Sequence, residues 1–219
     1  MPRYSKVKSF LNLFKRALLG EEHEFTQGSI DKAILLLAIP MILEMAMESV
    51  FAVVDVYFVS KLNDNDAVAT IGLTESVLTL IYSLAIGLSM GATAMVARRV
   101  GEKDIRGAEL AATQALYIGV TISVVVSVIG YWFAGDILRL MGGNEHLIQS
   151  NVGYTRWMFS GNITIMLLFL INAIFRGAGD ASLAMRSLML ANALNIVLDP
   201  LFIFGWGPVP AMGIEGAAI

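Results

Sequence analysis

The sequence predicts an all-α membrane protein, a polytopic bundle of transmembrane helices. Three observations lead to this fold class. Apolar residue types make up 57% of the 219 residues and charged types only 15%, against roughly 25% charged residues in an ordinary soluble domain. The apolar residues gather in runs that reach the ~20 residues a helix needs to cross a bilayer. Short polar or glycine-bearing segments separate these runs.

The apolar runs predict five complete spans and the start of a sixth. Buried helices of a large soluble protein are the alternative, but such helices are usually shorter and keep a polar stripe. The sixth span opens near Met212, and the sequence ends inside it at Ile219. The five complete spans are residues 34–59, 67–97, 108–133, 152–175 and 183–206.

The segments between the runs support this division. Pro208 and Pro210 follow the fifth run, and proline cannot continue a helix. The third connection is the longest, and it turns at Gly142, Gly143 and Asn144, residue types that favour turns. The four connections between complete spans are residues 61–66, 98–107, 135–150 and 176–181.

Lys and Arg residues gather on one side of the predicted membrane. Twelve of the 15 lie in the tail before the first span, in residues 98–107 and beside residues 176–181. The opposite connections hold only Lys61 and Arg139, with Arg156 just inside the fourth span. Because cytoplasmic loops carry the excess of Lys and Arg, we expect a multi-pass protein of the cytoplasmic (inner) membrane with its N-terminus in the cytoplasm.

The chain divides into two predicted parts. Residues 30–219 form the transmembrane part, truncated within its sixth helix. Residues 1–29 form a cytoplasmic tail, and its segment 7–19 places three apolar residues on one helical face: Phe10, Phe14 and Leu18. This amphipathic pattern suits a helix that lies on the membrane surface. A solvated tail helix is the alternative.

Five carboxyl groups fall inside the predicted spans: Glu44, Glu48 and Asp55 in the first, Glu75 in the second and Asp199 in the fifth. A carboxylate in a bilayer costs at least ~2.5–3.5 kcal/mol, so each is a candidate functional group. Three of them lie in the outer half of the membrane, where Arg156 is the only nearby cation. We therefore expect some of these acids to hold a proton or to share a cation. Simple hydrogen bonding to neighbouring polar side chains is the alternative.

The acids belong to two polar stripes. At about 100° per residue, Glu44, Glu48 and Asp55 project from one side of the first helix. By the same spacing, three residues of the fifth helix fall within about 60° of one another: Asn192, Asn195 and Asp199. Because lipid cannot satisfy these groups, both stripes are expected to face the interior of the bundle or a wet cavity.

Several other functions are disfavoured by the residues. The net charge of −3 and the lack of a basic stripe argue against nucleic-acid binding. The sequence has no P-loop. The two histidines, His23 and His146, lie in polar segments, so no histidine-rich metal site is expected. No set of catalytic residues was found.

Motifs in the spans resemble those of multidrug and toxic compound extrusion (MATE) transporters from about residue 34 to the end. Pro40 follows Ala38-Ile39, and Asp55 lies fifteen residues after the proline within V-D-x-x-F-V-S. The segments A-R-R-x-G-E-K at 97–103, F-R-G-A-G-D at 175–180 and N-x-x-L-D-P-L-F-I-F-G at 195–205 are similar to family motifs, as is G-I-E-G-A-A at 213–218.

The resemblance implies an exporter with twelve helices in two six-helix lobes, of which this sequence supplies the N-terminal lobe and lacks the C-terminal one. Members exchange H⁺ or Na⁺ for an amphipathic, often cationic, compound by alternating access. By position, Asp55 and Asp199 match the acids tied to cation coupling, and Pro40 matches the hinge where the first helix bends. Polar residues around the acids match at Tyr154, Asn172 and Asn195.

The same resemblance makes Asp55, Asn195 and Asp199 a candidate Na⁺ site, with no cofactor beyond the coupling ion. Glu44, Glu48 and Glu75 are additional intramembrane acids outside the family pattern, and Ala217 stands where some relatives carry a threonine. Three rival functions are a lipid-linked precursor flippase, an integral-membrane enzyme such as a prenyl transferase, and a non-transporting assembly subunit. The flippase would favour a cavity rich in Arg and Lys, and the enzyme would need paired Asp motifs.

Overall fold

The computed structural model describes residues 14–18, 29–62 and 64–219. Its long helices are α2 (Ile30–Ser60), α3 (Asn65–Gly101), α4 (Ile105–Leu140), α5 (Glu145–Gly177) and α6 (Ala181–Phe204), followed by the 3-10 helix η1 (Gly213–Ala217). Each of the five long helices is long and apolar enough to cross a membrane. The predicted all-α fold with five complete spans is therefore confirmed. The predicted start of a sixth span coincides with η1.

The helices are longer than the apolar runs that predicted them. Helix α4 continues to Leu140 and α5 begins at Glu145, so the long connection predicted at residues 135–150 is wrong. These extra turns are stabilised by packing, since Leu138 is buried against Leu147 and Ile148. Helix α3 has 37 residues, or about 56 Å at ~1.5 Å per residue, so it must tilt or protrude from the bilayer.

Local sequence signals fix where the helices begin and end. The side chains of Asp64, Asp104, Asn144 and Asp180 accept hydrogen bonds from backbone N–H groups at the starts of α3, α4, α5 and α6. These N-caps satisfy donors that a helix leaves unpaired. Helix α6 stops at Gly205, whose φ of +75° is one that glycine adopts at little cost. It therefore ends two residues before the predicted Trp206.

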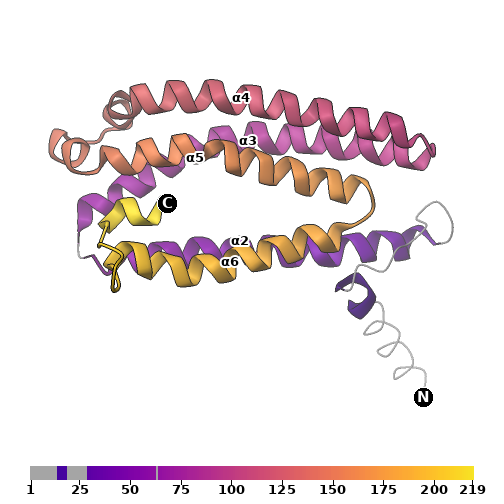
Figure 1. The fold of residues 1–219 in the computed structure, drawn as a ribbon, viewed down its shortest axis with the longest axis horizontal. Helices are drawn as coiled ribbons and strands as arrows, with labels where there is room; N and C mark the ends of the chain where they lie inside the picture. The colour runs from indigo at the N-terminus through magenta and orange to yellow at the C-terminus, as the bar shows by residue number, and fades with distance from the viewer. Residues whose placement is uncertain (1–13, 19–28, 63) are drawn as a thin grey trace, which may run out of the picture.

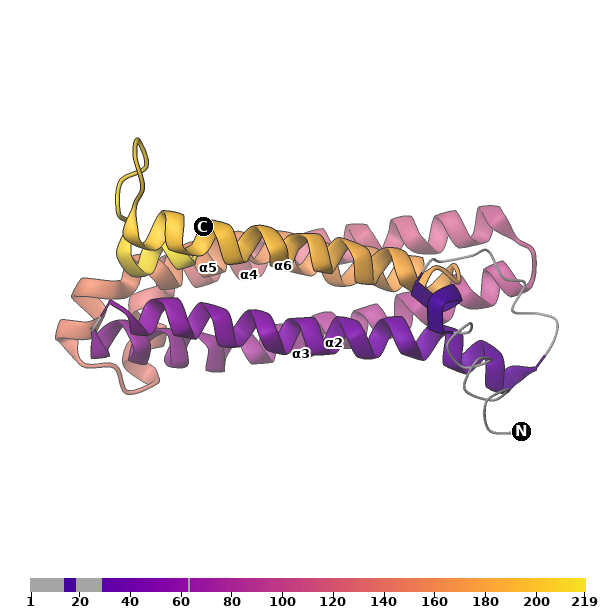
Figure 2. The ribbon, with the colours of Figure 1, turned by 90° about the horizontal axis from the view of Figure 1, so that it is seen from below.

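The five helices form two groups (Figures 1 and 2). Helices α3, α4 and α5 pack together, and α2 pairs with α6 on the other side. The start of α2 and the connections at residues 102–104 and 178–180 lie at one end of the bundle, here named the proximal end. The end of α2, the start of α3 and residues 141–144 and 205–212 lie at the opposite, distal end. The helices thus alternate in direction, as spans joined by short connections must.

The three-helix group is held by close approach and by buried hydrogen bonds. Gly119 and Gly130 of α4 lie directly against Leu170 and Phe159 of α5. Buried polar side chains bond across the helices, Thr74 with Thr155 at 2.9 Å and Asn162 with Ser123 at 3.4 Å. The half-buried Thr93 donates to the carbonyl of Ala173 at 3.0 Å. Such contacts hold membrane helices together, because lipid supplies no hydrophobic force between them.

The short described stretch of the tail contacts the proximal end. Residues 14–18 are helical, and Ala17 is buried against Leu36 and Ile39 of α2. Arg186 of α6 donates two hydrogen bonds to the carbonyl of Leu18, at 2.8 and 3.3 Å. Most of the predicted tail, including much of the amphipathic segment 7–19, lies outside the described residues.

We expect Gly130→Ala to lower the unfolding temperature, because a Cβ there would overlap the ring of Phe159. Overpacking costs about 1–3 kcal/mol, more than the ~0.5–1 kcal/mol that alanine gains over glycine in a helix. The matched control is Gly161→Ala, where a Cβ meets nothing within 4 Å, so the unfolding temperature should hold or rise. Thermal unfolding of the purified protein in detergent measures both. Equal temperatures for the two variants would contradict a tight α4–α5 contact.

Candidate functional site

A cluster of polar side chains lies toward the distal end, where both helix groups meet. Asp55 of α2 and Asp199 of α6 lie within electrostatic reach of each other, and so do Asp55 and Glu75 of α3. Tyr154 of α5 lies within electrostatic reach of Asp55 and Glu75 and is 1% exposed. Four helices therefore contribute to this distal cluster.

Asn195 and Asp199 lie one turn apart on α6, and this spacing joins their side chains. The Nδ2 of Asn195 donates a hydrogen bond of 2.6 Å to Oδ1 of Asp199. Asp199 is only 4% exposed. One turn earlier, Asn192 donates to the backbone carbonyl of Met47 on α2 at 3.1 Å. Asn192 of the polar stripe on α6 thus bonds to α2, whereas the spacing alone predicted only that the stripe faces the bundle interior or a wet cavity.

Three oxygens of the distal cluster are buried without a hydrogen-bond partner among the described residues: Oδ1 of Asp55, Oδ1 of Asn195 and Oδ2 of Asp199. Buried polar atoms normally have partners, so an unpaired set is a feature to explain. Carboxylate and amide oxygens suit a proton or a small hard cation. Among the described residues, no three His, Cys, Asp or Glu side chains gather as a metal site. The three unpaired oxygens of the distal cluster belong to two carboxyl groups and one amide.

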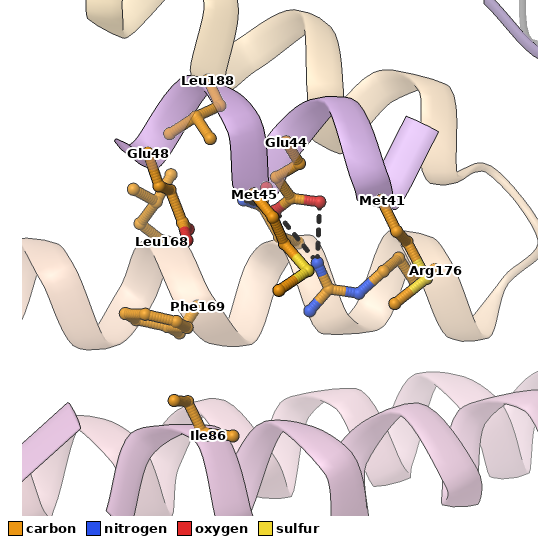
Figure 3. Close-up of a pocket in the computed structure, with 10 residues that line it drawn as sticks. Met41, Glu44, Met45, Glu48, Ile86, Leu168, Phe169, Arg176 and Leu188 are labelled. Atoms are coloured by element: carbon orange, nitrogen blue, oxygen red, sulfur yellow. Dashed lines mark hydrogen bonds and ion pairs between the residues drawn. The ribbon is translucent and has the colours of Figure 1, made fainter. Parts of the chain in front are cut away.

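A second polar site lies toward the proximal end, around a cavity of about 230 Å³ between α2, α3, α5 and α6. Its polar lining is Glu44, Glu48, Asn172 and Arg176. Its apolar lining is Met41, Met45, Ile86, Leu168, Phe169 and Leu188. Figure 3 shows Arg176 reaching from α5 to Glu44, while Glu48 extends from α2 toward Leu168 and Phe169.

Glu44 and Arg176 form a buried ion pair across this cavity. The Nη1 of Arg176 lies 3.0 Å from Oε1 and 3.1 Å from Oε2 of Glu44. The Nδ2 of Asn172 donates to the same Oε1 at 3.3 Å. The side chains of Arg176 and Glu44 are 18% and 9% exposed. Glu44 is 11 residues before Asp55, about 16 Å along the helix, so the proximal and distal sites are separate.

The model of the MatE family matches residues 40–201 of this sequence, which is most of the chain. The chain belongs to the MatE family. The matched range runs from Pro40 to the residues just after Asp199, so it contains both polar sites.

Relatives of this MatE chain are named as transporters. It is 29% identical over 92% of its length to the FAD transporter of Shewanella oneidensis, and 24% identical over 89% to the multidrug export protein MepA of Staphylococcus aureus. A solved outward-facing multidrug resistance MATE transporter of the MOP superfamily is 32% identical over 90% of the chain, with a TM-score of 0.80. These relatives are membrane transporters rather than enzymes.

The chain spans less than half of each relative: 44% of the FAD transporter, 42% of MepA and 44% of the solved MATE chain. One lobe of a two-lobe transporter would cover a share of this size. The family match and the five apolar helices together make this chain a multi-pass membrane protein of the MatE family.

The MatE chain brings together most of the predicted coupling residues and leaves one apart. Asp55, Asp199, Asn195 and Tyr154 all belong to the distal cluster. Asn172 lies instead beside Glu44 in the proximal cavity. It is 18 residues beyond Tyr154 on α5, about 27 Å along the helix. The match to the family by sequence position did not show that Asn172 lies so far along the helix from the distal cluster.

The three additional acids occupy different surroundings. Glu75 lies at the distal cluster, Glu44 is ion-paired, and Glu48 lines the cavity with no hydrogen bond to another described residue. From the sequence, Arg176 was placed in the connection at residues 176–181, and its partner was not predicted. The position of Arg176 next to the end of an apolar run was a signal for such a contact. A long cationic side chain in the last turn of an α-helix can reach back along the helix.

Pro40 is buried in α2, which continues through it from Ile30 to Ser60. Proline removes one backbone hydrogen bond from the helix interior and weakens the helix there. Pro40 is one turn before Glu44, so the weakened turn adjoins the ion pair. Its role as a hinge stays a prediction.

Proposed function

We propose that this chain forms the N-terminal lobe of a cation-coupled antiporter. The transporter would exchange H⁺ or Na⁺ for amphipathic, often cationic, drugs or toxic compounds across the cytoplasmic membrane by alternating access. A C-terminal lobe would complete it. The observation that carries this proposal is the distal cluster, in which Asp55 and Asp199 approach each other from α2 and α6 with unpaired oxygens.

The coupling argument is electrostatic. Two carboxylates in a water-poor site repel each other strongly when both are charged. A proton or Na⁺ bound between Asp55, Asn195 and Asp199 removes this repulsion and lets α2 and α6 stay together. Loss of the cation restores the repulsion and favours a different arrangement of the two helices. Tyr154 would bound the site from α5, and Pro40 would let α2 bend.

Glu75 is an additional acid in this scheme. Its interaction with Asp55 means that its charge would influence how tightly the coupling cation is held. Asn172 would serve the proximal cavity, where its amide meets Glu44. We assign Glu44 and Glu48 to the same cavity, since both line it.

The charged side chains that line the cavity favour a cationic substrate. Two carboxylates face one guanidinium there, and this guanidinium is already paired with Glu44. The Shewanella relative is named for FAD, whose two phosphates would need several free cations. A lipid-linked precursor flippase would need the same, so this rival is disfavoured by the same observation.

We expect Asp55→Asn and Asp199→Asn to reduce cation-driven drug export to the level of vesicles without the protein, because asparagine keeps the shape but cannot take up a proton or balance Na⁺. Drug accumulation in vesicles, with Na⁺ and pH gradients imposed separately, measures this and identifies the coupling ion. Glu102→Gln is the control, since Glu102 is an acid in the exposed connection after α3. Unchanged export by both aspartate variants would refute the coupling assignment.

The proposed orientation places the proximal end, with the N-terminus, in the cytoplasm. This chain has no cysteine, so the labelling of single introduced cysteines can report the orientation of the chain in the membrane. Lys103→Cys at the proximal end should react with a membrane-impermeant reagent only in inside-out vesicles. Met141→Cys at the distal end should react only in right-side-out vesicles. The reverse labelling pattern would show that the orientation is wrong.

A further inference from the structure

Glu44 joins the two helix groups. Within helices α2 to α6, the hydrogen bonds that run from the α2–α6 pair to the α3–α4–α5 group all end on its carboxylate, and their donors are Asn172 and Arg176. The pair and the group otherwise bond within themselves, as Asn192 does to Met47 and Thr74 to Thr155. Release of Glu44 would therefore remove the polar connection between the groups near the proximal end.

The geometry of the ion pair makes it exchangeable. Arginine binds a carboxylate most strongly through two nitrogens in parallel. Here a single nitrogen, Nη1 of Arg176, serves both oxygens of Glu44. Neither Nε nor Nη2 of Arg176 bonds to another described residue. A buried pair of this kind recovers only part of the cost of removing its two charges from water.

The side chain of Arg176 can also adopt a second position, in which it leaves Glu44. It is the penultimate residue of α5, at the proximal end, and its side chain is already 18% exposed. A long arginine side chain can keep its stem on the apolar surface while its head turns toward water. Glu44 has no such freedom, since it lies in mid-helix and its side chain is 9% exposed.

The surroundings of Glu44 suit a small organic cation. Met41, Met45 and Phe169 give the cavity an apolar, polarizable wall, and sulfur and aromatic groups contact aromatic ligands favourably. Glu48 adds a second carboxylate on the same side, within electrostatic reach of Glu44 and Arg176. The volume of about 230 Å³ is below the ~300–1,000 Å³ of ordinary ligand sites, so it fits the charged head of a larger amphiphile.

We propose that Glu44 binds the cationic group of the exported amphiphile, and that Arg176 is a built-in competitor for the same carboxylate. This inference rests on the proposed function. The substrate cation takes the place of Nη1 at Glu44, and Arg176 turns toward the proximal end. Substrate binding thereby breaks the link between α2 and α5, one turn beyond Pro40.

The competition predicts an effect that a merely structural ion pair would not give. Removing the competitor in Arg176→Gln should raise the affinity for an amphipathic monocation by about fivefold or more, a typical coupling between sites. Glu44→Gln should lower it. Arg176→Lys, which keeps the positive charge, should stay close to the unmodified protein. A structural pair predicts that both neutral variants weaken binding together.

Calorimetric titration of the full-length transporter in lipid nanodiscs measures these affinities. Benzyltrimethylammonium is the probe, and neopentylbenzene, its uncharged isostere, is the reference ligand. Glu48→Gln provides a matched background, because Glu48 lines the same cavity without pairing to Arg176. Arg176→Gln should raise the cation affinity in the unmodified and Glu48→Gln backgrounds but not in the Glu44→Gln background. A gain that persists without Glu44, or no gain at all, overturns the proposal.

A second readout needs no change to the ion pair. Labels at Ile42→Cys on α2 and Ile171→Cys on α5, both exposed positions, report the distance between the helices. Benzyltrimethylammonium should change this distance and neopentylbenzene should not; equal responses overturn the inference. If the unmodified protein neither binds nor exports amphipathic cations, the proposed function itself fails. If it does both but Arg176→Gln brings no gain, only the competitor role fails.

Discussion

The structure depends on one constraint: a polar group inside the bilayer must find its partner within the protein. Thr74 bonds to Thr155, Asn162 to Ser123, and Asn195 to Asp199, each between or along helices. The same constraint turns the polar stripes of α2 and α6 inward, because lipid offers them nothing. The unpaired oxygens of Asp55 and Asp199 indicate a candidate binding site for the same reason, since burying them without a partner would cost several kcal/mol.

The helix groups differ in how tightly they are held. Glycines let α4 approach α5 closely, and hydroxyl and amide bonds join α3, α4 and α5. The α2–α6 pair meets this group at an apolar cluster that joins Val59 and Ile203 to Tyr154, at the distal cluster and at Glu44. The last two of these contacts carry charge. In a medium of low dielectric constant, the paired and unpaired states of a charged contact differ strongly in energy. Ions bound at the boundary between the two helix groups can therefore change the positions of the helices.

Much of the fold and part of the site could be predicted from the sequence. Run length predicted the spans, whereas the side chains of Asp64, Asp104, Asn144 and Asp180 cap the helices at starts earlier than the apolar runs predicted. Spacing placed Asn192, Asn195 and Asp199 on one face, because spacing within a helix is set by local geometry. The helix ends around residues 135–150 could not be predicted, since packing of Leu138 on Leu147 and Ile148, rather than apolarity alone, continues the helices there.

The sequence by itself determined the number of complete spans, the inward direction of the polar stripes and the residues that carry charge in the membrane. These follow from the cost of polar groups in lipid, which depends on residue type alone. Only the tertiary structure decided which charges meet. Glu44 pairs with Arg176, 132 positions away, and Asn172 joins them rather than Asp55. Partners across helices are selected by the depth and rotation of each helix, and these arise only when the helices pack.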